Sequence, residues 1–426
     1  MQRGYKVINL EHLPGHDIDV SPDHPNLYWP FGQHILSGAK LIAHHPNLYA
    51  VYLTNHGCGP DTMLSHLFRE EMGDKPYLQI EVDEHFSKVG VITRIEAFLN
   101  SLNHREAQPL PEDFRLMDVR FRQENMGTAV QLGKTVLVPD LGVYTKYLCQ
   151  YIEEACGVEA EALPPMSRLQ LVMGRTETAS KEYLPFTALL GSVLYHELLA
   201  KGENSYLIPS TEGAEADGQY ARAIRAVLNR RGNLDAHILA PVLETLPLHV
   251  PQPELLFRAL ITGDLLYMSD PAQREALAPD HIPDEAELLA LAETIGRQSR
   301  TGRRIAAVGT PLCLTSLNEG VLEQLEREGE HILRSLLSET LLFQWQEHGE
   351  VKKKCRNFLT AQTALLSRLA GLTRENSSFC QDQERLHQTA DAYLPTVSGG
   401  NARYRFAKAI ELGKRCGAVL SLAPPV

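Results

Sequence analysis

Short apolar runs rich in β-branched residues alternate along the chain with longer stretches of helical periodicity. Runs of this kind are typical of buried parallel strands, and they span residues 6–10, 48–53, 77–82, 135–139, 205–209, 236–240, 304–308 and 418–422. The helical stretches between them span residues 32–45, 62–71, 92–102, 144–155, 186–200 and 220–230. This alternation of strand and helix predicts doubly wound α/β domains.

Pattern and composition together divide the chain into five segments. The run KTVLVPDLG, the helix YTKYLCQYIEEAC and the strand VEAEALPP read as one complete βαβ crossover. Charge and proline interrupt the pattern after Ser101, which predicts a domain boundary there. We expect an N-terminal α/β domain (1–105), a linker (106–132), a second α/β domain (133–250), a mostly helical subdomain (251–372) and a C-terminal α/β segment (373–426).

Composition narrows the classes of partner. The 426 residues include 41 Lys and Arg against 53 Asp and Glu, a net charge of −12, which disfavours nucleic acid or an anionic membrane as the main ligand. No stretch approaches the ~20 apolar residues of a membrane span, and the first residues lack the core of a signal peptide. We therefore expect a cytoplasmic protein. Seven scattered cysteines without a CxxC pair argue against a disulfide framework and a zinc ribbon.

Cys58 lies in a turn between a predicted strand and a predicted helix. Gly57 and Gly59 flank it and let a bulky ligand approach the backbone, while the helix begins near Asp61. A helix start stabilises a thiolate, which makes this a candidate ligand-binding turn. The alternative is a buried structural cysteine whose glycines serve only the backbone geometry.

A second candidate cluster follows the next strand. Asp83, Glu84 and His85 stand at its carboxyl end, where open α/β sheets form their sites, and Arg94 follows on a helix. A cluster of carboxylates, His and Arg can orient a ligand or move protons. It can equally be a structural ion-pair network between strand and helix, and that alternative is slightly favoured.

A third turn, STEGAEADGQY, ends a strand and starts a helix near Gln219 and Tyr220. It lacks the Lys and Ser/Thr of a phosphate-binding P-loop, and the chain carries no GxGxxG, so a dinucleotide site is not supported. Cys149 and Cys156 lie on one helical pattern ~10 Å apart along its axis and are not expected to ligate one small cluster. Cys313 follows a strand and is a second candidate functional thiol, with core packing as its alternative.

Residues 28–102, which contain NHGCGPD, DKPYLQIEVDEH and TRIEAF, closely resemble the dehydratase-like portion of the large CoA-substrate-specific enzyme activases, a group related to 2-hydroxyacyl-CoA dehydratases and benzoyl-CoA reductases. The resemblance continues more thinly through KTVLVPDLG, ASKEYLPFTALLG, STEGAEADGQY and FAKAIELGKRCGAVLSLAPP. It implies two or more doubly wound, mainly parallel, flavodoxin-like sheets with a helical insertion.

The resemblance also implies a chemistry. Active relatives hold a [4Fe-4S] cluster with cysteines from several loops and pass one electron to an acyl-CoA thioester, so that the ketyl radical loses a β-positioned hydroxyl. The electron comes from an ATP-hydrolysing activase. Because the ATPase domains of the large activases have no counterpart here, we expect no ATP site in this chain and a separate activase or a paralogous subunit as partner.

The chain departs from the family at the cluster ligands. Tyr183 stands in KEYLP and Glu215 in GAEADGQY where relatives carry cysteine, and Leu141 stands near another cysteine or polar position. Only Cys58 is plainly retained as a metal ligand. Phenol and carboxylate oxygens suit iron-sulfur iron poorly. We therefore expect that the chain alone does not bind a full-occupancy cluster.

Two functional hypotheses follow. The first is a degenerate dehydratase-like protein that keeps the fold and an acyl-CoA-sized cleft or partner surface. The alternative is an active iron-sulfur component, a lyase of the 2-hydroxyacyl-CoA dehydratase type. In either case we expect four turns to converge on one rim of the parallel sheets, because each lies at a strand end or a helix start. They are the turns at Cys58, at 83–85, at Tyr183 and at 211–219. The C-terminal run GAVLSLAPPV is expected to be a buried strand at which the chain stops early, as a truncated chain, a misread frame or one half of a split pair, because relatives continue past it.

Overall fold

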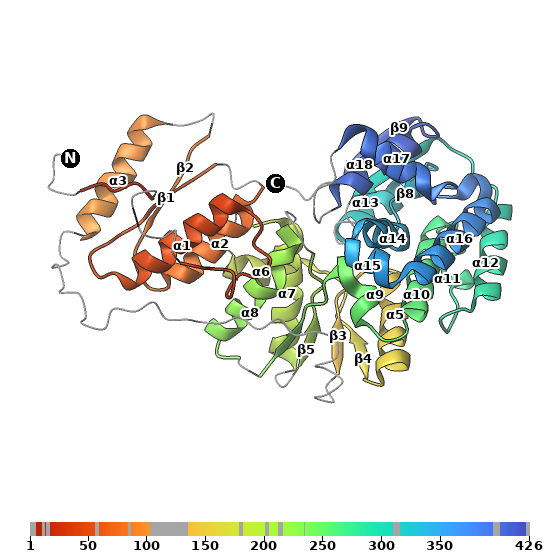
Figure 1. The fold of residues 1–426 in the computed structure, drawn as a ribbon, viewed down its shortest axis with the longest axis horizontal. Helices are drawn as coiled ribbons and strands as arrows, with labels where there is room; N and C mark the ends of the chain where they lie inside the picture. The colour runs from red at the N-terminus through yellow and green to blue at the C-terminus, as the bar shows by residue number, and fades with distance from the viewer. Residues whose placement is uncertain are drawn as a thin grey trace.

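The computed structural model describes residues 6–10, 13, 18–55, 59–83, 87–102, 135–178, 182–200, 204–211, 216–233, 235–309, 316–394 and 401–422. Over this part of the chain the architecture is α/β, with three separate sheets whose strand pairs are all parallel (Figure 1). Parallel pairing requires a crossover between strands, which explains the alternation of strand and helix in the sequence.

The first sheet consists of strands β1 and β2, with the register Val51↔Leu78 to Thr54↔Glu81. Its elements are α1 (Pro30–His44), β1 (Val51–Thr54), α2 (Asp61–Met72), β2 (Leu78–Glu81) and α3 (Lys88–Leu102). Helices α1 and α2 pack on each other, whereas only Leu102 of α3 is buried. The outer face of β1 stays open, because Val51 and Leu53 are exposed.

The second sheet has the strand order β4-β3-β5-β6. Strand β4 lies on one side of β3 and β5 on the other, so the winding direction reverses at β3, which is the arrangement that opens a crevice at the carboxyl ends of the strands. Its elements are β3 (Val136–Val138), α5 (Tyr144–Tyr151), β4 (Ala160–Ala162), α6 (Arg168–Glu177), α7 (Leu184–Leu199), β5 (Ser205–Leu207), α8 (Tyr220–Arg230), β6 (His237–Leu239) and α9 (Leu246–His249).

The third part is mostly helical around the sheet β8-β7-β9. Its elements are α10 (Pro253–Met268), α11 (Arg274–Leu277), α12 (Glu285–Arg297), β7 (Arg304–Gly309), α13 (Ser316–Arg327), β8 (His331–Arg334), α14 (Leu337–Glu347), α15 (Gly349–Lys354), α16 (Arg356–Thr373), α17 (Gln383–Tyr393), α18 (Ala402–Gly413) and β9 (Ala418–Leu422). Its helices share one large apolar core with α5, so the second and third parts are packed together.

The structure differs from the expectations at three points. Residues 6–10 form no strand. The segment 251–372 is mostly helical and contains β7 on the predicted run 304–308, but it also contains β8, which no predicted run covers, and β9 pairs with β7, so the C-terminal segment completes the sheet of this subdomain. Strand β9 is not buried, because Ala418 and Val419 are exposed at the edge of that sheet. The expected linker 106–132 lies outside the described residues. No helix in the described ranges is both long and apolar enough to span a bilayer.

Candidate functional site

The turn before α2 is organised around Asp61. Its carboxylate accepts hydrogen bonds from the Thr54 hydroxyl (2.8 Å), the Asn55 amide (3.0 Å) and the Tyr52 hydroxyl (3.4 Å). Gly59 has a φ of +59°, a left-handed conformation that favours glycine. Asp61 therefore fixes the turn to the end of β1. Gly57 and Cys58, which were predicted to bind ligand and metal, lie outside the described residues.

Tyr183 joins this turn to the second part of the chain. Its hydroxyl donates to the carbonyl oxygen of Gly59 at 3.2 Å. The neighbouring Glu182 lies 3.1 Å from Nδ1 of His66 on α2, and the side chains of both are fully buried. Burial lowers the pKa of His66, but the hydrogen bonds to Glu182 and Glu70 outweigh it and leave that pKa raised. The KEYLP segment is thus held against the start and middle of α2.

Residues 216–219, the described end of the turn before α8, lie against the same helix. Gln219 donates through Nε2 to the Asn26 carbonyl oxygen (2.7 Å), and the Ser210 hydroxyl donates to the Gly218 carbonyl oxygen (3.3 Å). Tyr220 is buried against Phe186, with ring centroids 5.2 Å apart. Gln219 and Tyr220 were predicted to bind ligand; both have these structural contacts, and Gln219 also lines a small cavity of about 10 Å³ beside Asn26 and Arg222. Glu215 lies outside the described residues.

The predicted carboxylate cluster is only partly described. The register of β1 and β2 puts Asp83 at the same sheet edge as the turn before α2, because Val82 donates its amide to the Thr54 carbonyl oxygen. Arg94 is exposed and donates to the Gln79 carbonyl oxygen at 3.1 Å. Glu84 and His85 lie outside the described residues. The structure therefore brings the turns at Gly59, Tyr183 and 211–219 together and places Asp83 at the edge of the first sheet.

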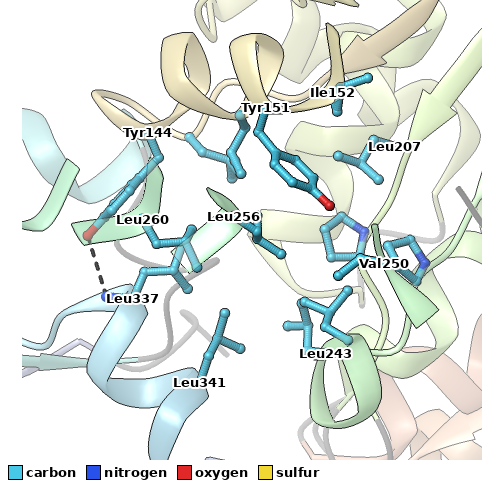
Figure 2. A pocket seen from close by; sticks show the side chains of 15 residues that line it. Tyr144, Tyr151, Ile152, Leu207, Leu243, Val250, Leu256, Leu260, Leu337 and Leu341 are labelled. Atoms are coloured by element: carbon cyan, nitrogen blue, oxygen red, sulfur yellow. Dashed lines mark hydrogen bonds between the residues drawn. The ribbon is translucent and has the colours of Figure 1, made fainter. Parts of the chain in front are cut away.

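A cavity of about 90 Å³ lies at the carboxyl ends of β3, β5 and β6. Figure 2 shows Leu256 between Tyr144 and Leu337 at one end of this chamber and Leu207 and Val250 at the other. All the lining side chains are aliphatic or aromatic, and they are Leu141, Tyr144, Leu148, Tyr151, Ile152, Leu207, Pro209, Pro241, Leu243, Leu246, Val250, Leu256, Leu260, Leu337 and Leu341. The chamber occupies the position at which a doubly wound sheet binds its ligands.

A buried carboxylate, Asp264, is hydrogen-bonded to two residues that line the chamber, Tyr144 and Leu337. Asp264 on α10 accepts from the Tyr144 hydroxyl (2.5 Å), the Leu337 amide (3.0 Å) and the amide and hydroxyl of Ser338 (amide 3.1 Å). Burial raises the pKa of Asp264 to about 7, although each of these hydrogen bonds lowers it. The same burial and the Asp264 charge raise the pKa of Tyr144. This cluster ties α5, α10 and the start of α14 together.

The described cysteines do not form a metal site. Cys149 and Cys156 are half-buried against the core of the third part, and a π-helical turn, Ile152–Cys156, lies between α5 and Gly157. Burial raises the pKa of Cys149 to about 11, which disfavours the thiolate that metals bind. Over the described ranges, no group of three or more His, Cys, Asp and Glu side chains could hold a metal ion. These residues do not fit a [4Fe-4S] cluster; Cys58 and Cys313 lie outside the description.

Comparisons of the chain with protein-family models, with curated proteins and with solved structures each gave no match.

The apolar chamber is the feature that sequence reasoning missed. Its lining residues are mostly leucines, tyrosines and prolines, with one isoleucine and one valine. In the sequence such residues cannot be told apart from residues of the hydrophobic core. One signal was available, since Leu141, Pro209 and Pro241 stand at the end of a predicted strand or within two positions after it, where a doubly wound sheet opens.

Proposed function

We propose that this chain is a 2-hydroxyacyl-CoA dehydratase-like protein that binds a short acyl-CoA as a component of a larger system and has lost the full iron-sulfur site. The observation that carries the proposal is the apolar chamber at the carboxyl ends of β3, β5 and β6. Flavodoxin-like layering is part of the proposal, supported by the strand order β4-β3-β5-β6. A separate activase or a paralogous subunit is the proposed partner.

The size of the chamber favours a short acyl chain. Benzene, with six carbons, occupies a leucine-lined cavity of ~150 Å³, so by proportion a 90 Å³ cavity suits roughly four carbons. The lining offers no charge to an acyl chain, because its polar atoms are tyrosine hydroxyls already bonded to Asp264 and to the Pro251 carbonyl oxygen. Each buried methylene contributes about 0.8 kcal/mol, which is roughly a fourfold gain in affinity.

The hydrogen bond of the Tyr183 hydroxyl supports the proposed loss of the cluster. At this position a cysteine would offer a thiolate, whereas the Tyr183 phenol donates a hydrogen bond to the Gly59 carbonyl oxygen. This bond connects the turn at Tyr183 to the turn before α2. The side chain therefore has a structural contact that does not depend on iron.

Calorimetric titration with coenzyme A, acetyl-CoA, butyryl-CoA and octanoyl-CoA tests the proposal. We expect butyryl-CoA, with two more methylenes, to bind about 15-fold more tightly than acetyl-CoA, and octanoyl-CoA to gain nothing further because the chamber is full. Leu256→Phe fills the chamber and is expected to remove the preference for butyryl-CoA, while Leu198→Phe, at an exposed position of α7, keeps it. Equal binding of all four compounds would contradict the proposal.

Iron and sulfide content after anaerobic reconstitution tests the second half of the proposal. We expect substoichiometric iron in both the unaltered protein and Cys58→Ala. A near-stoichiometric cluster that disappears in Cys58→Ala would instead favour an active iron-sulfur component.

A further inference from the structure

The opposite face of α5 borders a second cavity. It has a volume of about 480 Å³, within the 300–1,000 Å³ typical of small-molecule sites. Three cations from three helices line it, namely Lys146 on α5, Arg274 on α11 and Arg327 on α13. The lining also contains two carboxylates, Glu275 and Glu323.

Arg274 is the distinctive side chain of this cavity. It is 13% exposed, donates through Nε to the Leu266 carbonyl oxygen (3.1 Å) and stacks over the Tyr267 ring. Its remaining neighbour is the fully buried Glu326, 3.5 Å from Nη2. That carboxylate already accepts hydrogen bonds of 2.9–3.0 Å from Arg300 and Arg334 on both oxygens. Arg274 is therefore the third guanidinium to pair with the Glu326 carboxylate, and its buried Nη2 makes this ion pair without a hydrogen bond.

The other two cations have partly or fully exposed carboxylate partners. Lys146 donates to the Pro279 carbonyl oxygen at 2.8 Å and lies 3.4 Å from Asp280, which is fully exposed, and Arg327 lies 3.1 Å from Glu323 on its own helix. Exposed pairs of this kind contribute little stability, so either side chain can turn toward a ligand at small cost. A buried guanidinium without a full partner, in contrast, gains substantially from an anion.

We infer that this cavity binds the phosphate group of a phosphorylated small molecule, with Arg274 as its main anchor and Lys146 and Arg327 at its sides. A phosphate carries a charge of about −2 at neutral pH and accepts several hydrogen bonds, which suits three converging cations better than a single carboxylate does. The inference does not depend on the acyl-CoA proposal, because the cavity and the apolar chamber lie on different faces of α5.

Calorimetric titration with sodium pyrophosphate at low ionic strength tests the inference. Arg274→Gln is expected to weaken binding roughly 10- to 100-fold, as for the loss of a charge-assisted hydrogen bond, and Lys146→Gln to weaken it several-fold. The control Arg297→Gln, an exposed helix-surface pair with Glu293, should bind as the unaltered protein does. If Arg274→Gln fails to fold, the Lys146→Gln titration still decides.

Coenzyme A serves as a second probe, because its phosphates are one source of this chemistry. If coenzyme A binds and its binding depends on Arg274, the cavity is assigned to the phosphates of the proposed acyl-CoA. If only pyrophosphate binds, the cavity is assigned to another phosphorylated molecule. Absence of pyrophosphate binding at millimolar concentration, or unchanged binding in both Arg274→Gln and Lys146→Gln, would overturn the inference.

Discussion

At the scale of single residues, several described side chains that were singled out from the sequence have structural contacts. Asp61 holds the turn before α2, and Gln219 fixes the turn before α8 to Asn26. These side chains look like ligand-binding candidates in the sequence because turns at strand ends need hydrogen-bonding side chains for either purpose. The sequence cannot separate the two uses, since the decisive partner lies far along the chain, as Gly59 does from Tyr183.

Asp264 gives a pH-dependent prediction. Its pKa is raised to about 7 by burial, so between pH 4 and pH 7 the folded protein holds a proton that the unfolded chain releases. Stability from this group is therefore full below pH 4 and is lost as pH rises toward 7, by about 4 kcal/mol over the window. Asp264→Asn carries no titrating proton, and we expect its melting temperature to fall less than that of the unaltered protein between pH 5 and pH 7.5.

Asp280→Asn provides the matched control, because Asp280 is fully exposed. Its pH profile should run parallel to that of the unaltered protein. The buried histidines titrate alike in all three proteins, so their contributions cancel in the comparison. Superimposable profiles for Asp264→Asn and Asp280→Asn would contradict the assignment.

At the scale of elements, apolar β-branched runs were a good guide to strands. Strands β1, β2, β3, β5, β6, β7 and β9 fall on predicted runs. Strand β8 was missed because its four residues, HILR, begin with a polar residue and end with a charged one, and they lie inside a segment with a helical pattern. Arg334 is buried there only because Glu326 on the preceding helix accepts its hydrogen bonds, a contact that no periodicity shows.

The contact between α6 and α7 depends on two glycines. A Cβ atom at Gly174 would lie 1.9 Å from the Thr187 carbonyl oxygen, and one at Gly191 would lie 1.9 Å from the Gln170 carbonyl oxygen. Alanine in a helix is ordinarily more stable than glycine by about 0.5–1 kcal/mol. Here we expect Gly174→Ala to destabilise by about 2 kcal/mol or more, since two helix backbones must move apart.

Gly371→Ala is the control for this prediction. Gly371 lies within α16, and a Cβ atom there meets nothing within 4 Å. Its substitution should raise the midpoint of urea unfolding, while Gly174→Ala lowers it. A shift in the same direction for both variants would show that the helices can separate freely.

At the scale of the whole molecule, the first and second parts meet through charges and through Met63 of α2, which is buried in the apolar core of the second part, whereas the second and third parts meet through one apolar core. Arg222 on α8 lies 2.6 Å from Glu70 and 3.5 Å from Glu71 on α2 and donates to the Asp23 carbonyl oxygen. In contrast, α5 packs against α10 within one apolar cluster. The first interface should therefore depend on the charge of Arg222, because removing one partner of a buried ion pair is costly, whereas the second should not.

Arg222→Gln tests this difference. The substitution leaves Glu70 and Glu71 with fewer cations at a largely buried site, so we expect faster amide hydrogen exchange in α1, α2 and α8 and unchanged exchange in α10 and α14. Arg368→Gln, at an exposed pair with Glu285, should alter neither region. Equally faster amide hydrogen exchange in all helices would mean that the three parts of the molecule open as one unit.

The pairing of β9 with β7 has a consequence for how the polypeptide is made. Between Gly309 and Ala418 lie 418 − 309 − 1 = 108 residues, and the ribosome must add all of them before the sheet gains its third strand. At 5–20 residues per second this takes roughly 5–20 s. During that interval one edge of β7 has no partner, so the nascent chain is expected to need protection from chaperones until β9 emerges.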